Sequence, residues 1–334
     1  MAVTVSNSPA GPAAGTDPAG RPAWWRSRTL LLIAAWAAAV SNGLIAVTGA
    51  TVRVTGSGLG CLTWPQCQPG SLIPVSRSGM AAIHQAIEFS NRTLTGVVLI
   101  TSLATFVLVL LQRPRRSRLL LLAAVAPFGV LLQAVWGGVV VLTGLRWWTV
   151  APHLLASLVI LFAALALVRR LYEPDGPARP VVAGPLRALV ALMMGVLALL
   201  CLAGTLVTAA GPHGGDAATP RLDLPVPALA HLHAGLLYGF LGLLVATAVA
   251  FLATGAPRRL LVRCGILIAV TLAQATIGLV QYAFGVPEVL VVSHVLGAVL
   301  LVTAAAGVWF ATTVREPVSP TAAVPVPGEI AARS

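Results

Sequence analysis

Long apolar runs alternate with short polar segments along most of this chain. Each run reaches the roughly 20 residues that a helix needs to cross the hydrocarbon core of a bilayer. We therefore expect an all-α polytopic membrane protein. Its eight predicted transmembrane helices are 29–49, 84–112, 119–143, 150–169, 186–210, 228–254, 260–284 and 289–313.

The composition agrees with this class. Of the 334 residues, 58% are hydrophobic and 9% are charged, which excludes a soluble globular domain. The net charge of +12 resides in arginines of short connections, so membrane lipid accounts for it and no nucleic-acid partner is expected. Segments 1–27 and 315–334 are rich in proline and alanine and are expected to be disordered tails.

The arginines also predict an orientation. Sixteen of the 21 lie in the two tails and in the connections that share their side, and four lie on the opposite side. Because positive charge accumulates in cytoplasmic connections, we expect a multi-pass protein of the cell membrane with both termini in the cytoplasm.

Three residues recur at a constant spacing. The pairs, each 141 residues apart, are Gln133 and Gln274, Gly137 and Gly278, and His153 and His294. A recurring pattern of this length is typical of duplicated units, and an even number of helices makes the two units parallel repeats. We expect two pseudo-symmetric four-helix bundles, at 28–170 and 186–314, joined by a cytoplasmic linker at 171–185.

The second predicted helix begins with unusual polarity for a membrane span. His84, Glu88, Asn91 and Arg92 follow helical spacing and share one face. Ionisable groups at membrane depth usually face a protein interior or a wet cavity, so this face is expected to line a site. The simpler alternative is that Glu88 and Arg92 merely pair with each other at the helix end.

Histidines at similar depth suggest heme iron. His233 and His294 in the second half are suited to a six-coordinate, electron-transferring heme. In the first half His153 faces Asn91, a poor iron ligand, so that iron would keep an open position beside Glu88, where substrate chemistry belongs. The alternative for each histidine is a simple hydrogen bond to a carbonyl.

Cys61 and Cys67 lie in the first connection on the side opposite the tails. In a non-cytoplasmic compartment, two cysteines six residues apart are expected to form a disulfide. The bond is either a structural staple or a redox-active pair near the heme site.

Together these motifs resemble the heme A synthase family, which has bacterial and mitochondrial members. The resemblance covers nearly the whole chain between the tails and includes the segment Glu88-Phe-Ser-Asn-Arg92 and the glutamine–histidine units. It implies heme b as cofactor in the C-terminal half and heme O as substrate in the N-terminal half. It also implies stepwise oxidation of the C8 methyl group to a formyl group, with Glu88 as the catalytic acid. Further implied partners are a heme O synthase and cytochrome oxidase assembly factors.

One position departs from the family. Many members have histidine where this chain has Asn91, which leaves His153 as the more secure ligand and gives His84 an open role. Two other functions use the same features: a membrane cytochrome b that oxidises quinol, and a heme-binding transporter built from parallel repeats. The sequence does not identify the electron acceptor, a quinone or another molecule.

Overall fold

The structure is a computed structural model that describes residues 24–75 and 80–317. Within them are eight helices long and apolar enough to cross a membrane, which confirms the predicted class. The long helices are α1 (Arg28–Val54), α2 (Met80–Leu111), α3 (Ser117–Leu142), α4 (Trp147–Tyr172), α5 (Gly184–Ala210), α6 (Val226–Ala253), α7 (Arg258–Ala283) and α8 (Glu288–Ala311). The shorter elements are the 3-10 helix η1 (Trp24–Arg26) and strands β1 (Ala178–Pro180) and β2 (Thr313–Arg315).

Several predicted boundaries were wrong. The first helix was expected to end at residue 49 but continues to Val54, so Arg53 belongs to its last turn. Trp24–Arg26 forms η1, and Arg315 belongs to β2, although both were placed in disordered tails. Residues 1–23 and 318–334 of these tails lie outside the described residues. β1 pairs antiparallel with β2, an element that the all-α prediction did not include.

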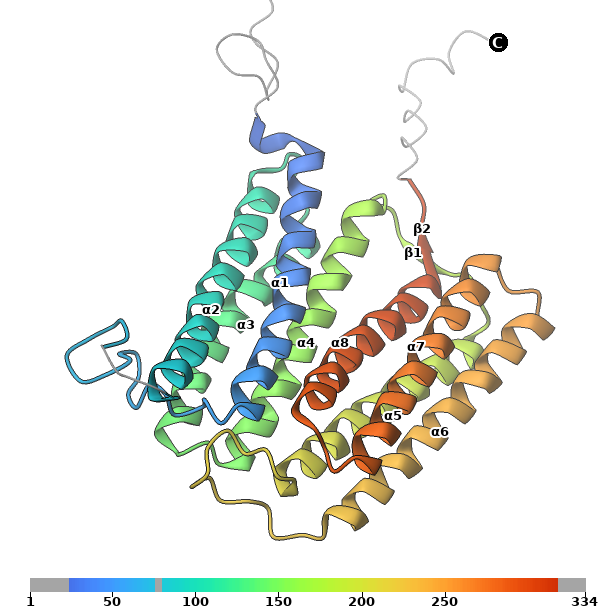
Figure 1. Cartoon of the computed structure of the whole chain (residues 1–334). Helices are drawn as coiled ribbons and strands as arrows, with labels where there is room; N and C mark the ends of the chain where they lie inside the picture. The colour runs from blue at the N-terminus through green and yellow to red at the C-terminus, as the bar shows by residue number, and fades with distance from the viewer. Residues whose placement is uncertain (1–23, 76–79, 318–334) are drawn as a thin grey trace, which may run out of the picture.

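The helices pack in sequence order, and α8 joins the two groups. Helices α1, α2, α3 and α4 each contact the next, and α4 contacts α1. The same order holds for α5 to α8, while α8 also packs against α1 and α4 (Figure 1). Phe162 of α4 and Phe310 of α8 meet with ring centroids 5.1 Å apart. The two groups therefore share a continuous apolar core.

Two turns have the same unusual backbone. Gly144 and Leu145 after α3 have φ of 70° and 58°, and Gly285 and Val286 after α7 have φ of 75° and 65°. Positive φ is uncommon for leucine and is especially so for a β-branched valine. The two turns are 141 residues apart, the spacing found in the sequence. This match supports the predicted duplication, which remains a prediction.

Both ends of the described chain lie on the same side of the helices, here called the terminal end (Figure 1). There Glu173, whose side chain is 9% exposed, pairs with Arg169 at 2.9 Å and Arg170 at 3.0 Å, with Arg315 at 3.7 Å. Burial lowers the pKa of Arg315, and the charge of Arg170 adds to this effect. A guanidinium nevertheless stays protonated at neutral pH. The cluster fastens β2 to the end of α4.

The opposite side, which carries Cys61 and Cys67, is here called the loop end. At this end Arg53 donates to the carbonyl oxygens of Thr208 at 2.8 Å and His213 at 2.5 Å. Arg53 thus links the first group of helices to the second.

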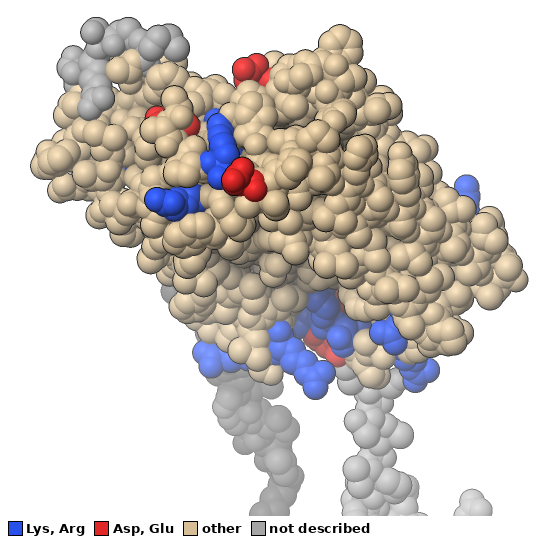
Figure 2. All heavy atoms as spheres, turned by 90° about the horizontal axis from the view of Figure 1, so that it is seen from below, with Lys and Arg blue, Asp and Glu red and all other residues tan. Residues whose placement is uncertain are grey.

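Figure 2 shows the charged side chains in groups with a broad uncharged surface between them, as expected for a chain that crosses a membrane.

Candidate functional site

A cavity of about 480 Å³ lies near the loop end. Its walls come from α1 to α5, α7 and α8, so it lies mainly in the first group of helices and reaches the second. The volume falls within the range typical of small-molecule and cofactor sites. Most of the wall is apolar. The polar side chains that carry chemistry are Arg53, Glu88, Asn91, Arg92, Gln133, His153, Gln281 and His294.

Glu88 has both carboxylate oxygens engaged. The backbone N–H of Cys61 donates to Oε2 at 2.6 Å, and Arg92 donates to Oε1 through Nε at 3.0 Å and Nη2 at 2.5 Å. Glu88 is only 4% exposed, so these charge-assisted bonds compensate for its burial. The expected Glu88–Arg92 pair is present, but it is not the only contact of the carboxylate. Glu88 also holds the first connection in place.

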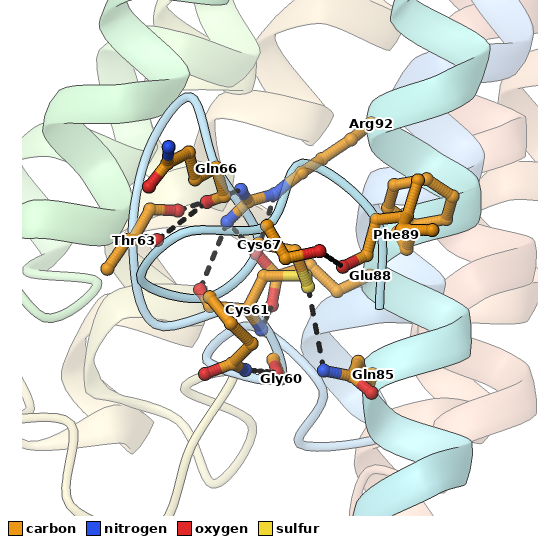
Figure 3. The surroundings of a disulfide bond; sticks show 12 residues. Gly60, Cys61, Thr63, Gln66, Cys67, Gln85, Glu88, Phe89 and Arg92 are labelled. Atoms are coloured by element: carbon orange, nitrogen blue, oxygen red, sulfur yellow. Dashed lines mark hydrogen bonds and ion pairs between the residues drawn. A yellow bond between two sulfur atoms is a disulfide. The ribbon is translucent and has the colours of Figure 1, made fainter. Parts of the chain in front are cut away.

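Arg92 continues this network across the loop. Its guanidinium donates to the carbonyl oxygens of Cys61 at 3.0 Å, Thr63 at 2.8 Å and Gln66 at 3.3 Å. Figure 3 shows Arg92 reaching from α2 across the loop that the Cys61–Cys67 disulfide closes. The predicted disulfide is therefore present. The Glu88–Arg92 pair of α2 holds its loop through hydrogen bonds to the loop backbone.

The disulfide loop covers part of the cavity. Trp64 and Pro65 line its wall, and the Trp64 ring lies against Gly138 of α3, where a Cβ atom would come within 2.6 Å of it. No larger residue fits at Gly138 without moving the ring. The loop thus limits access from the loop end, and Glu88 and Arg92 fix its position.

His153 points to the cavity from α4. Its backbone carbonyl accepts a hydrogen bond from Gln133 at 2.7 Å, while its buried Nδ1 has no partner among the described residues. Asn91 lies on the same cavity wall, and its Oδ1 accepts a hydrogen bond from Thr48 at 2.7 Å. An amide oxygen already used by a hydroxyl is a still poorer iron ligand. His153 is therefore the first-group residue suited to hold iron.

His233 and His294 face each other in the second group. Their ring centroids are 6.3 Å apart and their planes are inclined by 58°. Two imidazoles that bind one metal from opposite sides, each through a bond of about 2 Å, have centroids about 6 Å apart. His233 Nδ1 lies 3.1 Å from the Leu200 carbonyl oxygen, which fixes the ring and leaves Nε2 free, as in metal-bound histidines. The pair fits a heme iron.

Glycines make room for each of these rings. A Cβ atom on Gly204 would come within 3.1 Å of His233, and one on Gly278 would come within 3.0 Å of His294. The carbonyl of His294 accepts a bond from Gln274 at 2.8 Å, matching the Gln133–His153 bond. In the predicted repeat, Gly49 aligns with Gly204, and Asn91 aligns with His233. Gly49 faces open space, which agrees with the short side chain of Asn91 in place of a ring.

His84 was predicted to lie on the same site wall as Glu88, Asn91 and Arg92, but it is not among the residues that line the cavity. Its part in a substrate site stays a prediction. Its Nδ1 lies 2.9 Å from the Ser57 hydroxyl, and it supports the start of the disulfide loop instead. Arg53 and Gln281 were not predicted from the sequence. Arg53 was hidden because its helix was predicted too short. The sequence held one indication of Gln281, because this polar residue occupies the repeat position that Val140 occupies in the first half.

These features define a class of protein: a polytopic membrane protein with paired histidines and a cavity that holds a buried carboxylate. Within the described residues no group of three or more metal-ligating side chains is present, so the paired histidines are suited to heme rather than to a bare ion.

Comparison with known proteins identifies the family. Residues 32–306 match the family described as "Cytochrome oxidase assembly protein", and the chain belongs to this family. The chain is 38% identical to a heme A synthase of Lysinibacillus sphaericus over 42% of this chain and 44% of the relative. It is 31% identical to a heme A synthase of Bacillus licheniformis over 39% and 42%. The predicted resemblance is confirmed.

A third relative has another name. A protoheme IX farnesyltransferase of Thermus thermophilus is 34% identical over 54% of this chain and 29% of the relative. The chain thus spans less than half of the length of each of these relatives. These matches alone therefore do not assign the activity of a whole relative to this chain.

Proposed function

We propose that this protein is a heme A synthase, which oxidises the C8 methyl group of heme O to a formyl group. The observation that carries the proposal is the cavity that brings the Glu88–Arg92 pair and His153 together beneath the disulfide loop. A quinol-oxidising cytochrome needs the histidines. It has no use for a buried carboxylate beside a heme whose iron keeps one axial position open.

The first group of helices is assigned the substrate. His153 is the residue that would hold the iron of heme O, and Asn91, engaged with Thr48, leaves the opposite side open. The cavity wall is largely apolar, which suits a porphyrin with a farnesyl chain. At the loop end, Trp64 of the disulfide loop lines the cavity and would limit the entry of bulk water. This arrangement would hold the substrate while leaving one coordination position of its iron open.

Glu88 is assigned the chemistry at the methyl group. Oxidation of a methyl to a formyl group removes four electrons from that carbon in two two-electron steps. One water molecule supplies the oxygen, four protons are released, and the electrons leave through heme b to the acceptor. Positive charge develops on the carbon, and a carboxylate at the cavity wall stabilises that charge. Because Arg92 and Cys61 hold both oxygens, Glu88 is oriented before the substrate arrives.

The second group of helices is assigned heme b, held by His233 and His294. When bound, heme b supplies one-electron transfer toward an acceptor such as a quinone. His294 lines the substrate cavity as well, so the two sites share a wall. Leu200 and Gln274 hold the two histidines in place. We further propose that the terminal end faces the cytoplasm at the cell membrane, and that a heme O synthase and oxidase assembly factors are partners.

The test is Glu88→Gln, which keeps the shape of the side chain and removes its charge. The variant should still bind heme O and retain heme b, but heme A formation should fall by roughly 100-fold or more. The measurement is chromatography of hemes extracted from cells that co-express a heme O synthase. The matched control is Glu288→Gln, an exposed acid at the loop end, which should leave heme A at the wild-type level.

Loss of the loop contact would also lower heme A formation, and two further measurements separate it from loss of the charge. The Cys61–Cys67 disulfide should resist alkylation in the variant, and heme O should still bind. Wild-type amounts of heme A from Glu88→Gln would remove this residue from the reaction. Protein that carries heme b alone, at two per chain, would instead favour a cytochrome.

A further inference from the structure

Arg53 is a cation at the cavity wall without a carboxylate partner among the described residues. A guanidinium has five N–H donors. The structure uses the Nε donor for His213 and one Nη2 donor for Thr208, both carbonyl oxygens of the second group. Three donors therefore remain. Arg92 differs, because Glu88 already neutralises its charge.

Gln281 lies on the same cavity and also lacks a partner. Its Oε1 is buried and makes no hydrogen bond within the described residues. A buried amide left unpaired is costly, and such groups usually await a ligand, ion or water. The ends of an amide exchange places by a half-turn about its last bond, so Gln281 can present its NH₂ group to an anion. The equivalent residue of the first half is Val140, so the polar group is not a product of the repeat.

We propose that Arg53, assisted by Gln281, binds the propionate groups of the substrate heme at the seam between the two groups of helices. This inference rests on the proposed function. The donors come from α1 and α7, one from each group, and both belong to the lining of the cavity that contains His153. Arginine is the residue best suited to a carboxylate, because its planar fork donates two parallel hydrogen bonds.

This contact would limit which methyl groups can react. On the porphyrin, the C5 and C8 methyl groups each share a ring with a propionate, whereas the C1 and C3 methyl groups do not. A residue that holds the propionates therefore also places the C8 methyl. Arg53 lies in the last turn of α1, and eight residues later the N–H of Cys61 donates to Glu88, so the anchor and the acid both lie at the loop end. Arg53 is accordingly a positioning residue.

The experiment compares heme O with its dimethyl ester, in which both propionates are uncharged. Each is titrated by Soret absorbance into protein purified with heme b in place. Wild-type protein should bind heme O roughly tenfold to 100-fold more tightly than the ester, as expected for loss of charge-assisted hydrogen bonds. Arg53→Gln should bind both forms weakly and alike. Arg146→Gln, an exposed arginine at the same end, should keep the wild-type preference.

A second variant guards against misfolding, because Arg53 also joins the two groups of helices. Gln281→Leu breaks no hydrogen bond in the described residues and should reduce the preference in part. Equal affinity of wild-type protein for both forms would overturn the inference while leaving the proposed function intact. Loss of heme b from Arg53→Gln, with the preference for heme O unchanged, would also overturn it, since the arginine would then serve the second-group heme. If wild-type protein bound neither heme O nor its dimethyl ester, the proposed function would be overturned as well.

Discussion

The three histidines assigned to iron are oriented by different partners. His233 is fixed through Nδ1 by a backbone carbonyl, whereas the buried Nδ1 atoms of His153 and His294 have no partner among the described residues. For these two, a glutamine binds the backbone carbonyl of the histidine itself. The side chains are thus positioned mainly by their helices and by the glycines opposite them.

A prediction at this scale concerns the second-group pair. His233→Ala or His294→Ala should abolish the low-spin heme b signal, because a six-coordinate iron needs both axial nitrogens. The measurement is the reduced-minus-oxidised spectrum of purified protein. His231→Ala is the control, since this exposed neighbour should leave the spectrum unchanged. Normal low-spin spectra from both variants would refute the assignment.

Single residues were predicted with uneven success. The polar face of α2 was correctly recognised as unusual, because charged groups at membrane depth stand out in a sequence. Arg92 was the predicted partner of Glu88, but its second partner, the Cys61 backbone, was not predictable. The two residues are 27 positions apart along the chain, and backbone donors leave no trace in residue type. For the same reason the bond between His84 and Ser57 was missed.

Among the elements, close helix contacts depend on glycines that face the histidine rings. Adding a methyl group at Gly204 or Gly278 would force the facing ring to move by a few tenths of an ångström. At Gly137 the corresponding distance to His153 is 3.6 Å, an ordinary contact, and at Gly49 there is open space. The second group of helices is therefore packed more tightly around its histidines than the first.

This difference predicts the outcome of four alanine substitutions. Gly204→Ala and Gly278→Ala should lower heme b retention several-fold, because overpacking costs about 1–3 kcal/mol. Gly137→Ala and Gly49→Ala should retain heme b at the wild-type level. Heme content per purified chain is the measurement. Equal losses from all four variants would show that the glycines act through general helix packing rather than through the rings.

The helices themselves were the most predictable elements. All eight were found because an unbroken run of about twenty apolar residues is rare outside membrane-spanning helices. Their ends were less predictable. Helix α1 continues past the predicted end at residue 49 to include Arg53, and α2 begins at Met80, four residues before the predicted start. Strands β1 and β2 were missed because three residues carry no recognisable alternation.

In the whole molecule, contacts at both ends join the two groups of helices. Arg53 joins them at the loop end, assisted by a backbone hydrogen bond from Gly58 to Gly215 at 2.8 Å. The Glu173 cluster and the β1–β2 pair act at the terminal end, with α8 between them. Joints at both ends hold the shared cavity wall in a fixed position.

The terminal joint can be tested through Glu173→Gln. Removing this carboxylate leaves three arginines facing one another, so stability should fall by about 2–4 kcal/mol. The thermal midpoint of detergent-solubilised protein is the measurement. Glu316→Gln is the matched control, because Glu316 and Arg179 form an exposed pair worth about 0.5 kcal/mol. A midpoint shift no larger than that of the control would show that the cluster does not stabilise the joint.

The common depth of the three histidines assigned to iron has an electrical consequence. His153, His233 and His294 all lie within the first turns of helices that start at the loop end. Under the proposed function, electrons that pass between the two sites travel along the plane of the membrane rather than across it. A charge that crosses the whole membrane gains or loses about 2.3 kcal/mol per 100 mV, but one that moves sideways crosses almost none of that field. Transfer between the two sites would therefore be nearly independent of the membrane voltage.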